Sequence, residues 1–144
     1  DTADTADAAD TADWKRALMQ RALAARDAAY APYSGYRVGA ALRAADGRVF
    51  TGCNVENAAY SPSLCAERLA VAEAVEAGAR DLTAIAVATA SDPPATPCGV
   101  CRQVLREFST DLVILCGNPE GGLREFTLAE LLPAGFSGEE LRRR

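Results

Sequence analysis

The sequence predicts an α/β domain in which a mixed five-stranded sheet carries helices on its faces. Three observations support this fold class. Helix-like and strand-like segments follow one another along the chain in the manner of layered α/β proteins. The chain has 144 residues, 49% of them hydrophobic, which is enough to bury one core. No apolar run approaches the ~18 residues needed to cross a bilayer, so we expect no membrane partner.

The N-terminus is an acidic, low-complexity tract. Residues 1–13 contain five Asp, no basic residue and no large apolar side chain. We therefore expect a disordered or frayed extension, with Asp13 capping the helix that follows, and assign the folded domain to residues 14–144. Without the tract, acidic and basic side chains balance, so no basic excess favours nucleic acid as a partner. Residues 142–144 are all Arg and are interpreted as a solvated tail.

The first half of the folded domain predicts one helix and a hairpin. Residues 14–30 place Trp14 and Leu18 at helical spacing, and the Pro and Gly of residues 32–35 end that helix. Two strand-like runs follow, at residues 36–43 and 48–55. Asp46-Gly47 lies between them, and this dipeptide tolerates the positive φ of a tight hairpin turn.

The second half alternates helices and strands. A helix ends at Gly78, a buried-looking strand follows it, and a Pro-rich loop leads into the next helix. A turn then separates two strands, and two short helices complete the chain. These elements span, in order, residues 65–77 (helix), 82–89 (strand), 98–108 (helix), 112–116 and 123–126 (strands), 127–132 and 137–142 (helices).

Cysteine and histidine counts narrow the chemistry. The chain has no His, which excludes histidine bases and imidazole metal ligands. It has five Cys, an odd number that argues against a disulfide framework. No secretory signal is evident at the start of the sequence, so we expect a cytoplasmic protein with reduced cysteines.

Two segments carry metal-binding chemistry. Cys65-Ala66-Glu67-Arg68 and Pro97-Cys98-Gly99-Val100-Cys101-Arg102 each begin a predicted helix. Thr96 is the expected N-cap of the second helix, and Pro97 fits its first position. The positive end of a helix dipole favours thiolates, which are the metal-binding form of cysteine. Three thiolates with one open position describe a catalytic zinc site.

Charged neighbours fit such a site. Glu67 lies close enough in sequence to serve as the proton shuttle of a zinc deaminase without binding the metal. Arg68 and Arg102 are expected to offset the thiolate charge by donating hydrogen bonds to sulfur. Cys53 and Cys116 read as packed small hydrophobes. The alternative is a non-catalytic zinc protein in which one of these two cysteines closes the site as fourth ligand.

The chain resembles the small homotetrameric cytidine deaminases over about residues 31–136. The resemblance implies a three-layer α/β/α sandwich of the cytidine deaminase type. It also implies one Zn²⁺ per chain on Cys65, Cys98 and Cys101, with Glu67 as the catalytic proton shuttle. The motifs that carry it are Pro32-Tyr33-Ser34, Val38-Gly39-Ala40-Ala41-Leu42, Gly52-Cys53-Asn54-Val55-Glu56-Asn57-Ala58, Cys65-Ala66-Glu67-Arg68 and Pro97-Cys98-Gly99-Val100-Cys101-Arg102-Gln103.

The resemblance also suggests substrate contacts. Asn54 and Glu56 alternate along a strand end and share a face, which suits hydrogen bonds to ribose hydroxyls. Tyr36 would stack on the pyrimidine, and its hydroxyl needs a partner. Phe136 would reach the site of a neighbouring subunit. Further substrate-binding positions implied are Ala58, Tyr60 and Ala66.

Two departures from the family pattern concern the mouth of the site. Tyr36-Arg37 stands where the family usually has Phe-Pro, and the loop Ser61-Pro62-Ser63-Leu64 lacks the usual Gly. These differences bear on substrate range and leave the zinc motifs intact.

The predicted function is zinc-dependent, hydrolytic deamination of cytidine and deoxycytidine to uridine and deoxyuridine, as in pyrimidine salvage. The expected partner is a small nucleoside, and the expected assembly is a homotetramer by resemblance. One alternative is a deaminase of the same fold that acts on another aminopyrimidine, such as a nucleoside antibiotic or a free base. Asn54 and Glu56 argue against the free base.

Overall fold

The centre of the molecule is one sheet whose strands lie in the order β2-β1-β3-β4-β5. The structure, a computed structural model, describes residues 2–142, and its side chains from residue 13 onward except Glu140. β3 and β4 are parallel and the other neighbours are antiparallel, which confirms the predicted mixed sheet. The strands are β1 (Gly39–Ala44), β2 (Val49–Cys53), β3 (Leu82–Ala88), β4 (Val113–Gly117) and β5 (Leu123–Thr127).

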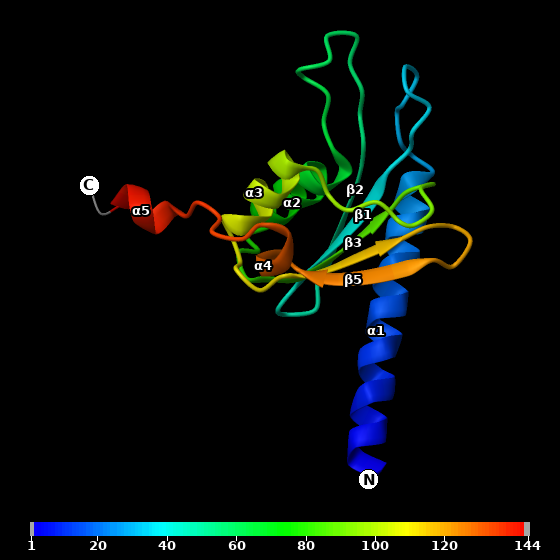
Figure 1. Cartoon of the computed structure of the whole chain (residues 1–144), viewed down its shortest axis with the longest axis vertical. Coiled ribbons are helices and arrows are strands. Elements are labelled where there is room, and N and C mark those ends of the chain that lie inside the picture. The colour runs from blue at the N-terminus through cyan, green and yellow to red at the C-terminus, as the bar shows by residue number, and fades with distance from the viewer. Residues whose placement is uncertain (1, 143–144) are drawn as a thin grey trace.

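Helices cover both faces of this sheet, so the three-layer prediction is confirmed. In Figure 1 the long α1 crosses one face, whereas α2 and α3 lie together on the other. Among the described residues, no helix is long and apolar enough to span a membrane. The helices are α1 (Thr2–Arg26), α2 (Ala66–Glu76), α3 (Gly99–Arg106), α4 (Leu128–Leu131) and α5 (Gly138–Arg142).

The central strand β3 shows how the two faces differ. Ile85 and Val87 point into the larger core, which includes the buried side of α2. The intervening Ala84 and Ala86 pack against α1 through the smaller core. The small side chains on one face allow α1 to lie close to the sheet. The branched side chains on the other face form a thicker layer under α2 and α3.

Two glycines permit these helices to approach the sheet. A Cβ at Gly39 would lie 2.0 Å from the Ala22 carbonyl oxygen of α1. A Cβ at Gly52 would lie 2.3 Å from the Ala66 carbonyl oxygen at the start of α2. Backbone cannot yield to such overlaps, so both positions require glycine. Gly52 therefore sets the start of α2, next to Cys65, against the end of β2.

The acidic tract differs from our expectation of disorder, because α1 already begins at Thr2. Alanine has the highest helix propensity, and extending a helix avoids the cost of nucleating one. Asp13 lies inside α1 and is no N-cap; its carboxylate is 3.9 Å from the guanidinium of Arg16. Asp1 and most of the basic tail, Arg143 and Arg144, fall outside the described residues.

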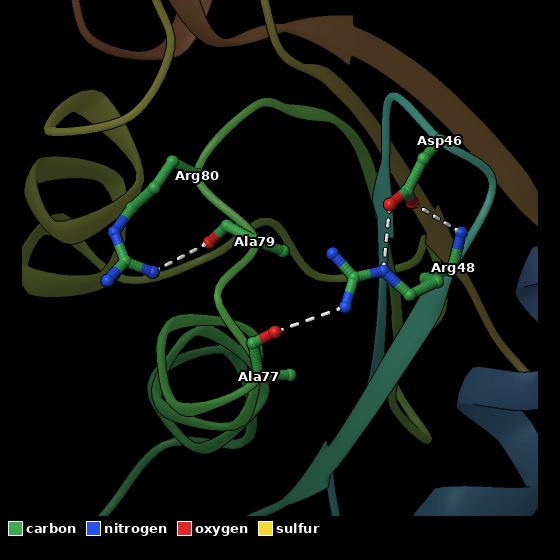
Figure 2. A network of polar contacts seen from close by, with 5 residues as sticks. All are labelled: Asp46, Arg48, Ala77, Ala79 and Arg80. Carbon is green, nitrogen blue, oxygen red and sulfur yellow. Dashed lines mark hydrogen bonds and ion pairs between the residues drawn. The ribbon is translucent and has the colours of Figure 1, made fainter.

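Polar contacts at the far end of the sheet tie the β1–β2 turn to the end of α2 (Figure 2). Arg48 donates to the Asp46 carboxylate at 2.8 Å and to the Ala77 carbonyl at 3.1 Å. Hydrogen bonds from Arg48 lower the pKa of Asp46. Arg80 donates to the Ala79 carbonyl at 3.1 Å. This network fixes the C-terminal end of α2 and leaves its cysteine-bearing N-terminus for the site.

Candidate active site

The N-terminal ends of α2 and α3 open onto a cavity of about 350 Å³. Its size lies in the range usual for small-molecule sites. It borders the carboxyl end of β3, the kind of position where ligands bind in open α/β sheets. The lining residues are Ser34, Tyr36, Val38, Asn54, Glu56, Ser63, Leu64, Cys65, Ala66, Glu67, Val87, Thr89, Ala95, Thr96 and Cys98.

Three cysteines converge beside the cavity. Cys65 and Cys98 are the N-caps of α2 and α3, and neither side chain makes a capping hydrogen bond. Their Sγ atoms lie 3.8 Å apart. With Cys101, all three Sγ atoms lie within 4.8 Å of one another. Thr96, predicted as the N-cap of α3, instead lies before it; the cap is Cys98 itself.

The electrostatics of the three sulfurs fit a bound cation. Hydrogen bonding from Cys101, and then from Arg68, lowers the pKa of Cys65 to about 5. The bond to Cys65 and burial raise the pKa of Cys101. The Cys65 thiol thus loses its proton readily, whereas a second thiolate would be repelled by the negative charge of the first. A cation between the sulfurs removes that repulsion, and zinc is the metal that tetrahedral thiolate sites favour.

The other two cysteines lie apart from this group. Among residues 13–142, only Cys65, Cys98 and Cys101 form a metal-sized group. Cys116 is buried on β4, and burial raises its pKa to about 11. Cys53 ends β2. The geometry therefore favours three protein ligands over a closed site of four.

Glu67 combines burial with access to the cavity. It lies in the first turn of α2, lines the cavity and is 4% exposed. Burial raises the pKa of its carboxyl, since desolvation disfavours the charged form. A carboxyl with a raised pKa is suited to take up and release a proton near neutral pH.

The two arginines predicted to support sulfur behave differently. Arg68 donates to Cys65 Sγ at 3.6 Å and to the Ser63 carbonyl at 3.0 Å, as expected. Among the described residues, Arg102 donates to oxygen atoms and not to sulfur, contrary to that expectation. It donates to the carbonyls of Pro97 at 2.8 Å and Leu131 at 2.7 Å, and to Thr96 Oγ1 at 2.9 Å. Arg102 thus holds the loop that carries Cys98 and acts on the site through the backbone.

Asn54 and Glu56 both line the cavity and are already engaged by the loop before β1. Asn54 accepts from the Val38 amide and donates to the Tyr36 carbonyl, each at 2.8 Å. Glu56 accepts from the amides of Tyr33 at 3.0 Å and Ser34 at 3.1 Å, and from the Ser34 hydroxyl. The bonds from Ser34 lower the pKa of Glu56. Glu56 therefore stays ionised and keeps oxygen lone pairs for a further donor.

Tyr36 has the hydroxyl partner that the sequence requires. Its Oη lies 2.6 Å from Ser91 Oγ. Tyr36 and Val38 both line the cavity, whereas Arg37 between them is exposed and is not one of its lining residues. The Arg at position 37, where the resemblance leads us to expect Pro, therefore alters the outer surface near the cavity entrance and not the cavity lining. β1 begins at Gly39 and not at the predicted residue 36. The reason is that the Asn54 side chain hydrogen-bonds the Val38 amide and the Tyr36 carbonyl, which a neighbouring strand would otherwise bond.

Of the other predicted contacts, only Ala66 lines this chain's cavity. Tyr60 lines a neighbouring hollow of about 240 Å³ that shares Ser34, Glu56 and Ser63 with the cavity. Ala58 is exposed in the same loop. Phe136 is 48% exposed beyond α4, where Gln103 donates to its carbonyl.

Sequence reasoning missed several lining residues. Thr89, Ala95 and Thr96 come from the loop between β3 and α3. One sequence feature could have indicated these residues: a buried strand runs directly into the loop that carries Cys98. Binding crevices form at the carboxyl ends of such strands. Val38, Ser63 and Leu64 adjoin predicted site residues and were detectable only by that proximity.

Comparison with known proteins places this geometry in a family. Residues 12–116 match the family described as the cytidine and deoxycytidylate deaminase zinc-binding region. A cytidine deaminase of Halalkalibacterium halodurans is 44% identical over 128 residues, covering 88% of this chain and 97% of that protein.

Solved structures agree. The 1.6 Å crystal structure of cytidine deaminase from Burkholderia pseudomallei has a TM-score of 0.82 and 48% identity, covering 84% of this chain and 98% of that one. The enzyme from Mycobacterium tuberculosis has a TM-score of 0.74 and 42% identity, covering 86% and 97%. The matches define a zinc-binding deaminase fold. The chain belongs to the cytidine deaminase family.

Proposed function

We propose that this chain is a zinc-dependent cytidine deaminase that converts cytidine and deoxycytidine to uridine and deoxyuridine. One observation carries the proposal. Three cysteine sulfurs lie within 4.8 Å of one another beside a cavity of about 350 Å³, which the buried Glu67 also lines. Family membership supports the reaction class.

The proposed ligands of zinc are Cys65, Cys98 and Cys101, one ion per chain. When bound, zinc supplies a water acidic enough to lose its proton near neutral pH. The helix N-termini at Cys65 and Cys98 stabilise the negative sulfurs. The hydrogen bond from Arg68 to Cys65 has the same effect.

Glu67 is the proposed catalytic residue. Its carboxylate takes a proton from water and delivers it to the pyrimidine ring nitrogen; it then carries the proton of the hydroxyl added at C4 to the departing amine, which leaves a carbonyl at C4. Its raised pKa makes the protonated state accessible at each stage. Water adds at C4 of the pyrimidine, the C4–N bond breaks, and ammonia leaves.

Other residues that line the cavity suit the nucleoside. Asn54 and Glu56 offer an amide and a carboxylate to the sugar hydroxyls, and Tyr36 offers a ring to the base. Ala66 lines the wall beside Cys65. The charge on Glu56 would repel a phosphate, so a nucleoside is favoured over a nucleotide or a nucleic-acid strand.

We further propose a homotetramer that works in pyrimidine salvage in the cytoplasm. Phe136 lies outside this chain's cavity and exposes 48% of its surface, which leaves it available to a neighbouring subunit's site. Ala58 and Tyr60 are proposed to border the entrance, where the neighbouring hollow shares Glu56 with the cavity. None of the five cysteines forms a disulfide, which fits a reducing compartment.

A direct absorbance assay tests the function. Cytidine, deoxycytidine, cytosine and cytidine monophosphate are offered to the zinc-loaded protein, and loss of the aminopyrimidine is followed. We expect turnover of both nucleosides and little of the base or the monophosphate. Preferred turnover of the base would instead favour a free-base deaminase and remove Asn54 and Glu56 from the sugar site.

A further inference from the structure

A hydroxyl pair joins two walls of the cavity. Tyr36 comes from the segment before β1, and Ser91 comes from the loop after β3. Their oxygens are 2.6 Å apart, and either hydroxyl can donate. Tyr36 lines the cavity and is 39% exposed.

Strand register explains why these two residues meet. Gly39 of β1 pairs with Ala88 of β3 in the antiparallel ladder. Tyr36 lies three residues before Gly39, and Ser91 lies three residues after Ala88. The two residues therefore lie the same number of residues beyond the ends of paired strands, which brings their segments to the same edge of the sheet.

Ser91 is itself held on both sides of its backbone. Its amide donates to Thr89 Oγ1 at 3.2 Å, and its carbonyl accepts from Asn118 Nδ2 at 3.0 Å. Asn118 is 3% exposed, and its Oδ1 accepts from the Gly122 amide at 2.8 Å. A buried amide anchored in the β4–β5 turn thus fixes the Ser91 backbone, from which the hydroxyl reaches Tyr36.

The Tyr36 ring needs such a support. Its backbone is held by Ser34 Oγ at 2.9 Å and by Asn54 Nδ2 at 2.8 Å. Those bonds leave both side-chain torsions free, so a half-exposed ring would sample several rotamers. The hydrogen bond to Ser91 restrains the far end of the ring and keeps it beside the cavity.

We propose that Ser91 is a positioning residue for nucleoside binding, which holds the Tyr36 ring in the orientation that stacks on the pyrimidine. The inference rests on the proposed deaminase function. Stacking is present in both the ground state and the transition state, so loosening the ring weakens uniform binding. Such a loss raises KM and leaves kcat nearly unchanged.

The test is a double-mutant cycle on the zinc-loaded protein. Ser91→Ala and Tyr36→Phe each should raise KM for cytidine about 2- to 10-fold, the effect of one neutral hydrogen bond. The KM of the double variant should be no higher than that of the more impaired single variant, because both substitutions remove the same hydrogen bond. Ser91→Thr retains the hydroxyl and should restore KM. Ser109→Ala, in the turn after α3, is the matched control. Zinc content should stay at the wild-type level throughout.

A readout without substrate separates this inference from the proposed function. In protein labelled at the ring carbon that bears the tyrosine hydroxyl, the ¹³C signal lost in Tyr36→Phe identifies Tyr36. That signal should move in Ser91→Ala and stay in place in Ser109→Ala. A signal unmoved by Ser91→Ala overturns the bridge, whatever the turnover.

The kinetic outcomes are equally distinct. Three results would overturn the positioning role. The first is a parental KM in Ser91→Ala, and the second is additive effects in the double variant. The third is a fall in kcat and zinc content without a rise in KM. A wild-type protein that leaves cytidine unchanged overturns the proposed function, and the role of the bridge in it, even where the Tyr36 signal moves.

Discussion

The two faces of the sheet are covered by helices that differ in what they contribute. α1 lies on alanines of β1 and β3 and packs through Leu18, Met19 and Ala22. α2 and α3 lie over the branched side chains of β1, β3 and β4, and their N-termini carry the cysteines. α1 contributes a close-packed layer over one face, whereas α2 and α3 also bring the three cysteines of the site to the edge of the cavity on the other.

This difference separates stability from chemistry. A substitution at the starts of α2 and α3 should alter zinc or rate while the sheet stays folded. A substitution under α1 should alter the free energy of unfolding while the site of the folded protein stays intact. The predictions below test that separation, beginning with the largest effect on activity.

Loss of a zinc ligand should abolish the reaction. Cys101 and Cys116 are both fully buried, but only Cys101 belongs to the sulfur group. We expect Cys101→Ala to lose zinc and turnover, and Cys116→Ala and Cys53→Ala to retain one zinc per chain. Metal analysis gives the content, and cobalt absorbance distinguishes three thiolates from four. Zinc loss in Cys116→Ala or Cys53→Ala would contradict a three-ligand site.

Glu67→Gln should nearly stop catalysis without emptying the site. The amide keeps the size of the side chain but cannot accept the water's proton. The rate should fall about 100- to 10,000-fold, the range typical of lost general acid–base catalysis. Zinc content and circular dichroism should match the parent. Glu73→Gln makes the same charge change on the exposed side of α2 and serves as control.

Parental turnover by a folded, zinc-loaded Glu67→Gln protein would refute the proton-shuttle role. Binding of a hydrated-pyrimidine analogue adds an independent measure. Its hydroxyl would lose an ionic partner in this variant, so the analogue should bind more weakly than it binds to the parent.

Glu56→Gln should impair nucleoside use by at least about tenfold, because a hydrogen bond to a charged group is worth about 1.5–3 kcal/mol. Folding and zinc content should change little. Ser34→Ala is the necessary companion, since Ser34 also bonds Glu56. If both variants lose cytidine kcat/KM to a comparable extent, the effect comes from the contact of Glu56 with the loop before β1 and not from a contact with the sugar.

The elements of the site were predictable from the sequence, but the partners of their side chains were not. Cysteines followed by amphipathic segments predicted both helix starts. Arg102 follows Cys101 just as Arg68 follows Glu67, yet only Arg68 bonds sulfur. The direction of a long side chain depends on which carbonyls the fold brings near, here those of Pro97 and Leu131.

Longer-range contacts limited the prediction in the same way. The sequence indicated that the Tyr36 hydroxyl needs a partner, but Ser91 becomes that partner only through the register of β1 with β3. The acidic tract lacked a hydrophobic stripe, which suggested disorder. Its continuation into α1 follows from the anchored helix beside it, since elongation needs no new nucleus.

Overpacking under α1 should reduce stability without affecting chemistry. Ala86 is fully buried between β3 and α1, and leucine there adds volume that the alanine layer cannot absorb. We expect Ala86→Leu to lower the free energy of unfolding by about 1–3 kcal/mol. Urea unfolding measures this, with Ala17→Leu on the exposed side of α1 as control. Zinc loss from folded Ala86→Leu protein would contradict the separation of the two faces.

Deleting residues 1–12 should have the smallest effect. In Figure 1 the N-terminal half of α1 projects beyond the sheet, and among the side chains described from residue 13 onward the core contacts of this helix include Trp14 and Leu18. We therefore expect the melting temperature, assembly and cytidine kcat/KM of the shortened protein to match those of the parent. A longer deletion of residues 1–18 removes Trp14 and Leu18 and should destabilise the fold, which shows that the assay detects loss of α1. A large drop in activity or assembly on removing residues 1–12 alone would show that the tract docks against a second chain or another part of the molecule, and the α1 face would then have a role beyond stability.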